Sequence, residues 1–286
     1  MVSTPTWTLT QIGPRSWNFA WPIGFYNTVF TVTDEGVIAL DPLNREAAAA
    51  YRAAIAQVTD QPIRFVVYSH DHLDHITGAD VLAPGVPIVA HKDVPGLLLH
   101  RGFRDIPLPT ILVDGTRTIE LGGEQWELQY LGPNHGRTNL SVLNRKERWV
   151  ALIDVVSSGL VPYRELPLSD WPGFVYALDR LAAMPVDTIM DGHCPPSPIA
   201  WASKYRRYLD DLLAATVDAR EQADEATILA ELPPGADGIQ MTEAMFVKTA
   251  KLAVERLRPV YGGWGAFEAW APQNVNRALI YLITGE

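Results

Sequence analysis

The pattern of apolar and polar positions divides the chain into a strand-rich part followed by a helix-rich part. Runs rich in β-branched residues at 27–33 and 36–41 flank an Asp-Glu-Gly turn, which predicts a β-hairpin. The segment 45–58 is alanine-rich and amphipathic, and Asn44 stands where a helix N-cap is expected. The next apolar run, 63–68, predicts a buried strand that ends directly before a group of histidines.

A second group of strands and a helix follows in similar order. The segment 86–91 predicts a short strand, and Asp170 and Pro172 stand where a cap and a first-turn proline favour a helix over 171–183. The segment 187–193 predicts a strand that ends in a histidine. Four further runs predict strands: 116–121, 124–132, 140–144 and 148–156. Two groups of strands, each followed by a helix, predict a layered α/β fold with helices outside the sheets.

Beyond about residue 200 the apolar spacing becomes helical. The segments 203–226 and 242–257 both carry apolar residues at helical intervals, and 231–238, which contains Pro-Pro-Gly, separates them. We therefore expect an α/β domain over residues 1–200 and a helical extension over residues 201–286 that packs on it and shapes a pocket. The second helical segment places four apolar residues on one face: Phe246, Ala250, Val254 and Leu257.

Composition and charge narrow the classes of function. The chain has 286 residues and a formal net charge of −10, without the clustered Lys and Arg that a nucleic-acid partner requires. No apolar window is long enough to span a membrane, and the first residues lack the pattern of a secretory signal. Because Cys194 is the only cysteine, a disulfide framework is excluded and we expect a cytoplasmic protein.

Histidines gather at the ends of predicted strands. His70, His72 and His75, together with Asp74, lie within six positions directly after the strand 63–68. Imidazole and carboxylate groups at such spacing are ligands that zinc takes in proteins. His135, Asp154 and His193 each lie between an apolar run and a turn, where the end of a strand can present them to the same point.

A structural role is the more frequent one for any single histidine after a strand, and His91 and His100 are assigned that role. His91 ends a strand and has no acidic residue next to it, and His100 lies at the end of a leucine-rich helix. Five of the seven histidines at strand ends, three of them within six residues, predict a metal site.

The motif His-Asp-His-Leu-Asp-His at 70–75, followed in order by His135, Asp154 and His193, resembles the metallo-β-lactamase superfamily of hydrolases. The resemblance covers roughly residues 7–200. It implies an αββα sandwich with a two-metal site at one edge, with the C-terminal helical extension outside the match. Carried over by motif position, His70, His72 and His135 hold the first metal, Asp74, His75 and His193 hold the second, and Asp154 bridges the two.

The resemblance also implies a chemistry. We expect two Zn²⁺ ions per chain, with Fe or Mn as alternatives, and hydrolysis of a small ester or lactone by a metal-bridging hydroxide. Metal binding lowers the pKa of water to about 7, so no activated Ser or Cys is required. Asp74 is the expected catalytic residue, orienting the nucleophile and passing a proton to the leaving group. Asp41, Ser69 and Asn134 are candidates to hydrogen-bond the ligands.

Several branches of the superfamily remain open. The ligand pattern is closest to that of lactonases and glyoxalase II. Lactonases carry a tyrosine shortly after the bridging aspartate, where this chain has Ser157, with Tyr163 in the following loop. A thioesterase or a β-lactamase of the same fold is an alternative. From another class comes a mononuclear iron dioxygenase of the persulfide type, which would use His70, His135 and Asp154. A binding protein without activity is a third possibility.

Aromatic residues near both ends of the chain predict an apolar substrate pocket. They either pack the helices onto the sandwich or wall a cleft over the metals. We expect a small, hydrophobic substrate to contact Trp264, Phe267, Tyr163 and Ser157. We expect no nucleic-acid partner and no membrane partner. The oligomeric state is open, and a homodimer is possible. The other aromatic candidates for the wall are Trp17, Phe19, Trp21, Phe25 and Trp270.

Overall fold

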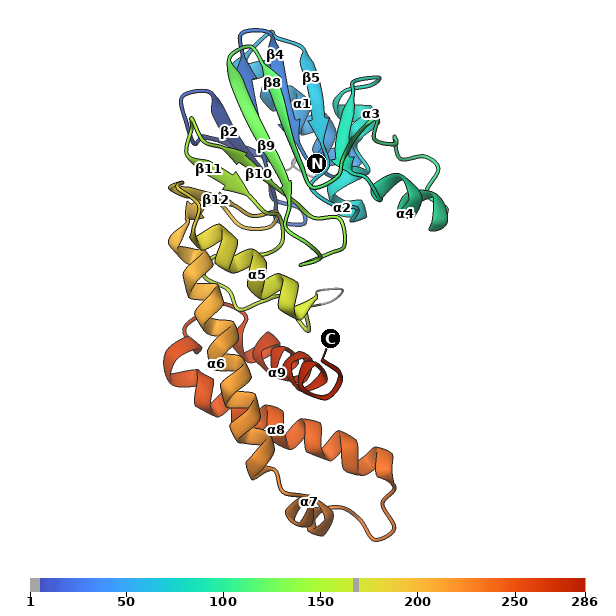
Figure 1. Ribbon diagram of the computed structural model, residues 1–286, viewed down its shortest axis with the longest axis vertical. Coiled ribbons are helices and arrows are strands. Elements are labelled where there is room, and N and C mark those ends of the chain that lie inside the picture. Colours follow the sequence, from blue (N-terminus) through green and yellow to red (C-terminus); the bar gives the residue numbers. More distant parts are fainter. Residues whose placement is uncertain (1–5, 167–169, 286) are drawn as a thin grey trace.

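Two β-sheets pack face to face and carry helices on their outer sides (Figure 1). The computed structural model describes residues 6–166 and 170–285. The first sheet follows chain order: β1 (Thr8–Gln11), β2 (Ser16–Trp21), β3 (Tyr26–Thr33), β4 (Gly36–Leu40), β5 (Ile63–Val67), β6 (Ile88–His91) and β7 (Ile111–Val113). The second sheet has the order β13 (Ser197–Pro198), β12 (Thr188–Met190), β11 (Trp149–Ala151), β10 (Leu140–Asn144), β9 (Glu124–Tyr130) and β8 (Thr116–Leu121). The predicted αββα sandwich is confirmed.

The helices cover both outer faces. Helices α1, α3 and α4 share an apolar core with the first sheet, and α5 shares one with the second sheet and the C-terminal helices. In the first part of the chain the helices are α1 (Arg45–Val58), α2 (Leu73–Ile76), α3 (Ala79–Leu82), α4 (Val94–His100) and α5 (Trp171–Ala182). The C-terminal helices are α6 (Ala200–Gln222), α7 (Glu225–Glu231), α8 (Gly238–Tyr261) and α9 (Phe267–Thr284).

Strand β4 supplies side chains to two cores. Val37 and Ala39 belong to the outer core, which also contains Tyr51 of α1, whereas Ile38 and Leu40 belong to the core between the sheets. Successive side chains of a strand alternate between its two faces. A strand buried on both faces therefore appears in the sequence as an unbroken apolar run.

Two tryptophans lie in the core between the sheets and connect them. Trp126 of β9 and Trp149 of β11 are fully buried, with their ring centroids 5.2 Å apart in an edge-to-face arrangement. Their indole N–H groups donate to the hydroxyls of Thr31 (3.1 Å) and Ser16 (3.0 Å) on the opposite sheet. Each buried donor thus has an acceptor, and the second sheet is hydrogen-bonded to the first through side chains.

The two predicted helix caps are confirmed. The Asn44 side chain accepts a hydrogen bond from the Ala47 N–H at 2.9 Å, at the start of α1. The Asp170 carboxylate accepts one from the Gly173 N–H at 2.7 Å, at the start of α5. Both caps satisfy backbone donors that have no partner within the helix.

The predicted strand over 148–156 is shorter than expected. Strand β11 covers Trp149–Ala151, and the chain then leaves the sheet. Asp154 has a φ of 63°, a left-handed conformation that a continuing strand does not allow. The departure from strand geometry places the Asp154 side chain at the edge of the sandwich.

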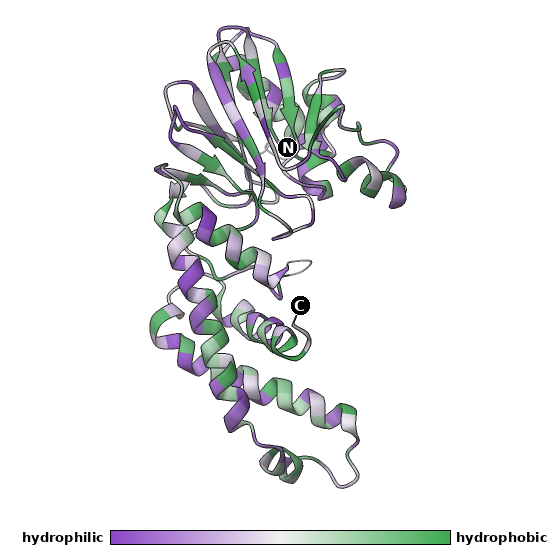
Figure 2. Cartoon of the chain, viewed as in Figure 1, coloured by the Kyte–Doolittle hydropathy of each residue, from purple (hydrophilic) through white to green (hydrophobic). Residues whose placement is uncertain are grey.

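The C-terminal helices form the predicted helical extension. Ala250, Val254 and Leu257 of α8 are buried in the core that these helices share with α5, and Phe246 packs partly against it. Figure 2 shows that α6 and α8 each carry both apolar and polar residues, as helices with one buried face do. The division of the chain into two domains at residue 200 stays a prediction.

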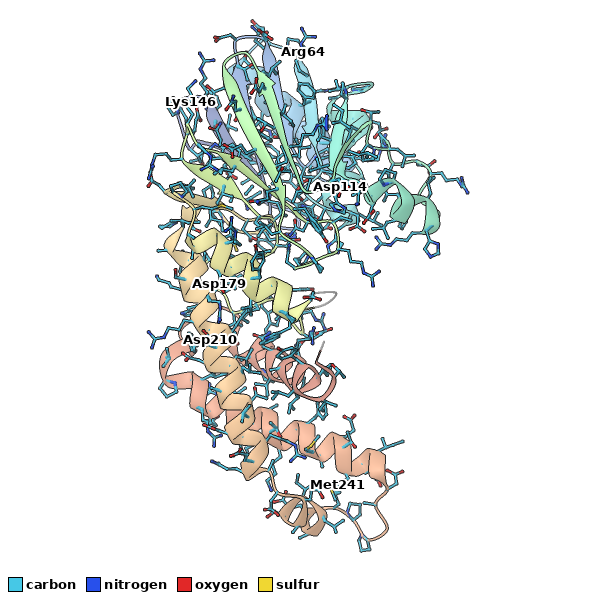
Figure 3. The ribbon with its side chains drawn as sticks, in the orientation of Figure 1. Arg64, Asp114, Lys146, Asp179, Asp210 and Met241 are labelled. Carbon is cyan, nitrogen blue, oxygen red and sulfur yellow. The ribbon has the colours of Figure 1, made fainter. Side chains whose placement is uncertain are left out.

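Most charged side chains in the described part of the chain lie on the outside of the molecule. The five charged residues labelled in Figure 3 are all exposed and carry both signs: Arg64, Asp114, Lys146, Asp179 and Asp210. In the described part of the chain, no helix combines the length and the apolar character needed to cross a bilayer. The expected cytoplasmic location stays a prediction.

Candidate metal centre

Loops at the carboxyl ends of four strands bring the predicted ligands together. The loop after β5, with the short helix α2, carries His70, His72, Asp74 and His75. The remaining ligand candidates follow β9, β11 and β12, and they are His135, Asp154 and His193. The edge formed by the carboxyl ends of strands is where open α/β sheets generally bind ligands. All seven candidates fall into two neighbouring clusters.

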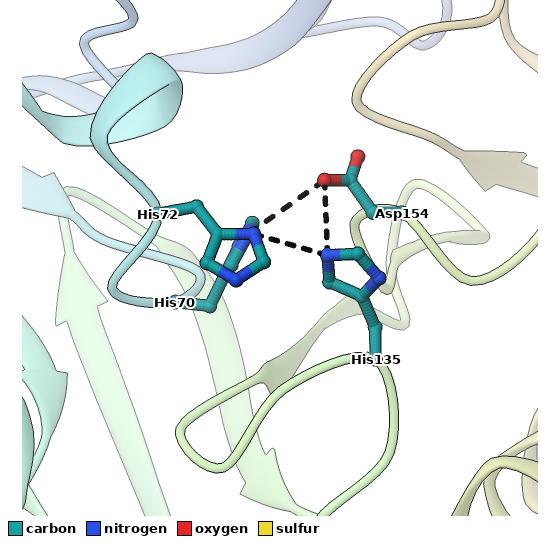
Figure 4. Close-up of side chains that lie close together, drawn as sticks. All are labelled: His70, His72, His135 and Asp154. Atoms are coloured by element: carbon teal, nitrogen blue, oxygen red, sulfur yellow. Dashed lines mark hydrogen bonds and ion pairs between the residues drawn. The ribbon is translucent and has the colours of Figure 1, made fainter. Parts of the chain in front are cut away.

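The first cluster consists of His70, His72, His135 and Asp154, whose ligand atoms lie within 4.8 Å of one another. His135 Nε2 lies 3.1 Å from His72 Nδ1. Asp154 Oδ2 lies 3.4 Å from His135 Nε2 and 3.6 Å from His70 Nε2 (Figure 4). Three imidazoles and one carboxylate thus converge on a single point.

The second cluster consists of Asp74, His75 and His193. Asp74 Oδ2 lies 3.5 Å from Nε2 of His75 and 3.5 Å from Nε2 of His193. Asp154 faces this cluster as well, because its Oδ2 is 3.2 Å from His75 Nε2 and its Oδ1 is 3.6 Å from His193 Nε2. The carboxylate of Asp154 therefore lies between the two clusters, in the position expected of a bridging ligand.

Buried polar atoms without a hydrogen-bond partner test whether the residues of the two clusters fit metal ions. His70 Nε2, His75 Nε2 and Asp154 Oδ1 are buried, and within the described chain none of them has a hydrogen-bond partner. Each buried polar atom without a partner costs about 1–3 kcal/mol, so such atoms are rare in native proteins. Imidazole nitrogens and carboxylate oxygens are the donors that divalent transition metals prefer. The residues present fit metal ions at these two clusters.

Burial and neighbouring charges set the protonation of the rings. Burial lowers the pKa of His70 well below its usual value, and that of His135 to about 4. Both rings are then neutral at pH 7, which is the form that binds a metal ion. Burial also disfavours charge on His75, but the carboxylates of Asp154 and Asp41 outweigh it and raise the pKa of that ring.

The partners expected for the ligands are in place. The Asp41 carboxylate accepts hydrogen bonds from the N–H (2.7 Å) and the hydroxyl (2.6 Å) of Ser69, and its Oδ2 lies 3.3 Å from His75 Nδ1. The Ser69 hydroxyl is 2.8 Å from His70 Nδ1. Asn134 Oδ1 accepts a hydrogen bond from the N–H of His135 at 2.7 Å. The Ser69 contact orients the His70 ring so that Nε2 faces the clusters, the Asp41 carboxylate lies behind the His75 ring, and the Asn134 contact holds the backbone of His135.

Sequence reasoning missed Asp71, which lies inside the histidine motif. Its buried carboxylate accepts hydrogen bonds of 2.5 Å from the Thr138 hydroxyl and of 2.5 Å from the guanidinium of Arg101. Thr138 belongs to the loop that carries His135, so Asp71 connects two ligand-bearing loops. The sequence did contain a signal for this role. Asp71 lies between His70 and His72, so its side chain points away from the metal cluster and needs another partner.

A second missed residue is Asp191, two positions before His193. Its buried carboxylate accepts hydrogen bonds from the backbone N–H of Asp154 at 3.1 Å and of His193 at 3.3 Å. Burial, together with the nearby charge of Asp154, raises the pKa of Asp191 to about 6. Asp191 thus fixes the backbone of the two ligand candidates Asp154 and His193.

A cavity of about 770 Å³ opens over the two clusters. His72, Asp74 and His193 form part of its floor, and of the expected substrate contacts Tyr163 and Ser157 lie in its wall. The other lining residues are mostly apolar and include Phe25, Val155, Leu160, Pro162, Leu166, Phe174, Tyr205 and Trp270.

Trp264 and Phe267, which were expected in the pocket wall, do not line this cavity. Trp264 packs between helices, with its ring centroid 5.1 Å from that of Tyr261 and 5.2 Å from that of Trp201. Phe267 is 2% exposed in the same core. Both sit where α9 joins α6 and α8, so their apolar surface is used for helix packing.

Of the N-terminal aromatic residues, Phe25 reaches the cavity. Phe19 and Trp21 are buried in the outer core of the first sheet. Trp17 stacks on Phe30 with ring centroids 5.5 Å apart. Their positions along β2 direct them to the sheet and its covering helices, away from the metal centre.

Comparison with known proteins gives two related chains that are named as subunits of one enzyme. The chain is 27% identical over 98% of its length to the 2,4-dinitroanisole O-demethylase subunit alpha of Nocardioides sp. (strain JS1661), of which it covers 81%. It is 29% identical over 62% of its length to the 2,4-dinitroanisole O-demethylase subunit beta of the same strain, of which it covers 55%.

Solved structures show the same fold. A metallo-beta-lactamase from Pontibacter korlensis superposes with a TM-score of 0.61 at 19% identity, over 71% of this chain and 98% of that one. A metallo-beta-lactamase from Erythrobacter litoralis superposes with a TM-score of 0.59 at 18% identity, over 72% of this chain and 97% of that one. The family model of the metallo-beta-lactamase superfamily matches residues 21–193, more than half of the chain and the whole span of ligand candidates. With this match and the sandwich fold, the chain belongs to the metallo-β-lactamase superfamily.

Proposed function

We propose that the protein is a metal-dependent hydrolase that cleaves a C–O bond of a small, largely apolar substrate, an ester or a lactone. The observation that carries the proposal is the position of Asp154 between two complete clusters, 3.4 Å from His135 Nε2 on one side and 3.2 Å from His75 Nε2 on the other. The cavity above them has mostly apolar walls, which favours a substrate with few charges.

Each ligand candidate has a place in this proposal. His70, His72 and His135 would hold one ion, and Asp154 would bridge to the other. Asp74, His75 and His193 would hold that second ion. When bound, a pair of Zn²⁺ ions supplies Lewis acidity and lowers the pKa of water. Two complete clusters favour this reading over a single iron held by His70, His135 and Asp154.

The chain's own residues would bind the substrate and move the proton. The Asp74 carboxylate lines the cavity and is 41% exposed, so it can reach both the attacking water and the leaving group. It accepts the proton that the water loses and returns it to the departing oxygen. Phe25, Leu160 and Tyr163 would enclose the substrate and exclude bulk water.

A second candidate reaction is the hydrolysis of an activated aryl methyl ether. It is favoured by the relative named as a 2,4-dinitroanisole O-demethylase subunit, whose match covers 98% of this chain, the C-terminal helices included. Water and the ether would give a phenol and methanol. The reaction involves no oxidation or reduction, so a hydrolytic site suffices. Both relatives are named as subunits, and we propose that this chain also assembles, with a second copy of itself.

The test is a substrate screen of the metal-loaded protein. The panel contains lactones, aryl esters, thioesters, β-lactams and 2,4-dinitroanisole. His72→Ala removes a ligand candidate, and we expect it to lower turnover at least about 100-fold. Removing a residue that only hydrogen-bonds a ligand lowers activity up to about 100-fold, so the loss of a ligand should cost at least as much. His100→Ala, an exposed histidine outside both clusters, is the matched control and should keep full activity. Full turnover by His72→Ala would refute the proposal.

A further inference from the structure

One wall of the cavity is formed by residues 157–166, called here the wall segment. It follows Asp154 in the chain, and its described secondary structure is an isolated β-bridge between Leu160 and Gly265. Arg164 and Leu166 have φ values of 48° and 50°, in the left-handed region that is unfavourable for residues with a side chain. Such a backbone persists when surrounding contacts impose it.

The C-terminal helices provide contacts that hold the wall segment. The loop before α9 pairs with it through hydrogen bonds from the Gly265 N–H to the Gly159 carbonyl (2.7 Å) and from the Val161 N–H to the Gly265 carbonyl (3.1 Å). The Tyr205 hydroxyl of α6 donates to the Ser157 carbonyl at 3.1 Å. The shape of this wall therefore depends on residues outside the part of the chain that matches the superfamily, 21–193.

Asn274 of α9 makes two of these contacts. Its side chain is fully buried, and its amide nitrogen donates to the carbonyls of Pro162 (3.0 Å) and Arg164. Its amide oxygen accepts a hydrogen bond of 2.7 Å from the Tyr208 hydroxyl. Both N–H donors and the oxygen are thus in use, and the two carbonyls that Asn274 holds flank Tyr163 on either side.

Tyr163 and Trp270 form an aromatic pair in the cavity wall. Their ring centroids are 5.1 Å apart at an interplanar angle of 80°, and both side chains line the cavity. Trp270 precedes Asn274 by four positions, which places the two on the same face of α9. One helix face therefore packs a ring against Tyr163 and fixes the backbone on both sides of it.

We infer that Asn274 is a positioning residue that sets substrate selectivity, by holding Tyr163 against Trp270 as a rigid wall for an aromatic ring of the substrate. Aromatic rings favour edge-to-face and offset contacts, which a fixed pair can offer and a mobile loop cannot. The inference rests on the proposed function only in taking this cavity as the substrate site. It assigns the recognition of an aryl group to the helical extension.

The first experiment measures binding, which is independent of turnover. Isothermal titration of the full-length, metal-loaded protein with 4-nitrophenol gives a Kd for the wild type and for Asn274→Asp. The substitution keeps the size of the side chain and the acceptor for Tyr208, but it replaces both donors with an oxygen that repels the two carbonyls. We expect Kd to rise about tenfold, the loss of one aromatic contact. Gln273→Ala, a half-buried residue of the same helix that does not line the cavity, should leave Kd unchanged.

A double-mutant cycle tests whether Asn274 acts through Tyr163. Tyr163→Ala should weaken binding by a similar factor, and the combined variant should be no weaker than Tyr163→Ala alone. Additive losses would overturn the inference, as would an unchanged Kd in a folded Asn274→Asp. Asn274→Ala introduces no charge and replaces Asn274→Asp in the cycle if thermal unfolding shows that the latter does not fold.

Kinetics separate this inference from the proposed function. With phenyl acetate, Asn274→Asp should raise KM and leave kcat unchanged, whereas KM for methyl acetate should not move. An equal fall of kcat for both esters would indicate a merely structural role and contradict the inference. If the wild type binds 4-nitrophenol with the expected pattern but hydrolyses neither ester nor any other member of the substrate panel, the proposed function fails and the assignment of Asn274 stands.

Discussion

Asp41 Oδ2 lies 3.3 Å from Nδ1 of His75, on the side of the ring opposite to the metal clusters. His75 Nε2 in turn faces Asp154 at 3.2 Å. A carboxylate behind an imidazole fixes its orientation and raises its basicity as a ligand, so Asp41 should contribute to metal binding without touching the ion.

We predict that Asp41→Asn weakens metal binding about 10–100-fold, because an amide oxygen supplies less negative charge to the ring. Competition with a chromophoric chelator measures the affinity. Asp80→Asn is the control, because Asp80 is a half-exposed carboxylate paired with Arg45 on the surface and should bind metal as the wild type does. Equal affinities for Asp41→Asn and the wild type would contradict the role of Asp41.

Asp71 should matter for stability even without metal. Asp71→Ala leaves the Thr138 hydroxyl and the Arg101 guanidinium without their buried acceptor, at a cost of about 1–3 kcal/mol in the free energy of unfolding. Urea unfolding of the metal-free protein measures this loss. Asp105→Ala is the control. It removes an exposed carboxylate in the loop after α4, four positions beyond Arg101, and should change the stability by less than about 0.5 kcal/mol. Indistinguishable midpoints for the two variants would show that the link is not stabilising.

Trp264 and Trp270 should separate stability from substrate binding. Trp264 packs among Tyr205, Tyr208 and Tyr261, so Trp264→Ala should cost about 2–3 kcal/mol of stability, somewhat less than a fully buried tryptophan. KM should not change. Trp270→Ala should raise KM instead, because this ring lines the cavity. A rise in KM for Trp264→Ala without a loss of stability would contradict this assignment and indicate that Trp264 contacts the substrate.

Cys194 should be unreactive in the folded protein. It is 6% exposed, and burial together with the charge of Asp191 raises the pKa of its thiol to about 12. The thiolate is the reactive form, so alkylation by iodoacetamide at pH 8 should be on the order of a thousand times slower than for a free cysteine. Mass spectrometry of the metal-free protein follows the reaction. Alkylation at the same rate with and without urea would mean that the thiol is accessible.

Local sequence signals were sufficient for much of the fold. The apolar runs of β3, β4 and β5 and the caps Asn44 and Asp170 are determined by neighbours within a few residues, and the structure has them where they were predicted. The seven ligand candidates were found for the same reason, because residue type and position at a strand end are both visible in the sequence. That they bind metal stays a prediction.

Contacts between distant segments were not visible in this way. Trp264 and Trp270 are both aromatic residues of one segment, and only the packing of α9 against α6 decides which faces the cavity. Asn274 appears in the sequence as one polar residue in a helix, yet it contacts carbonyls 110 and 112 positions away. Periodicity cannot reveal such a partner, because the wall segment has no regular spacing of its own.

The metal content of the purified protein tests the central claim most directly. We predict about two divalent ions, zinc in the first instance, per chain by inductively coupled plasma mass spectrometry. Asp154→Ala, which removes the carboxylate between the clusters, should lower this number, whereas His100→Ala should not. A chain that holds no stoichiometric metal, or one iron with oxygen uptake, would contradict the account.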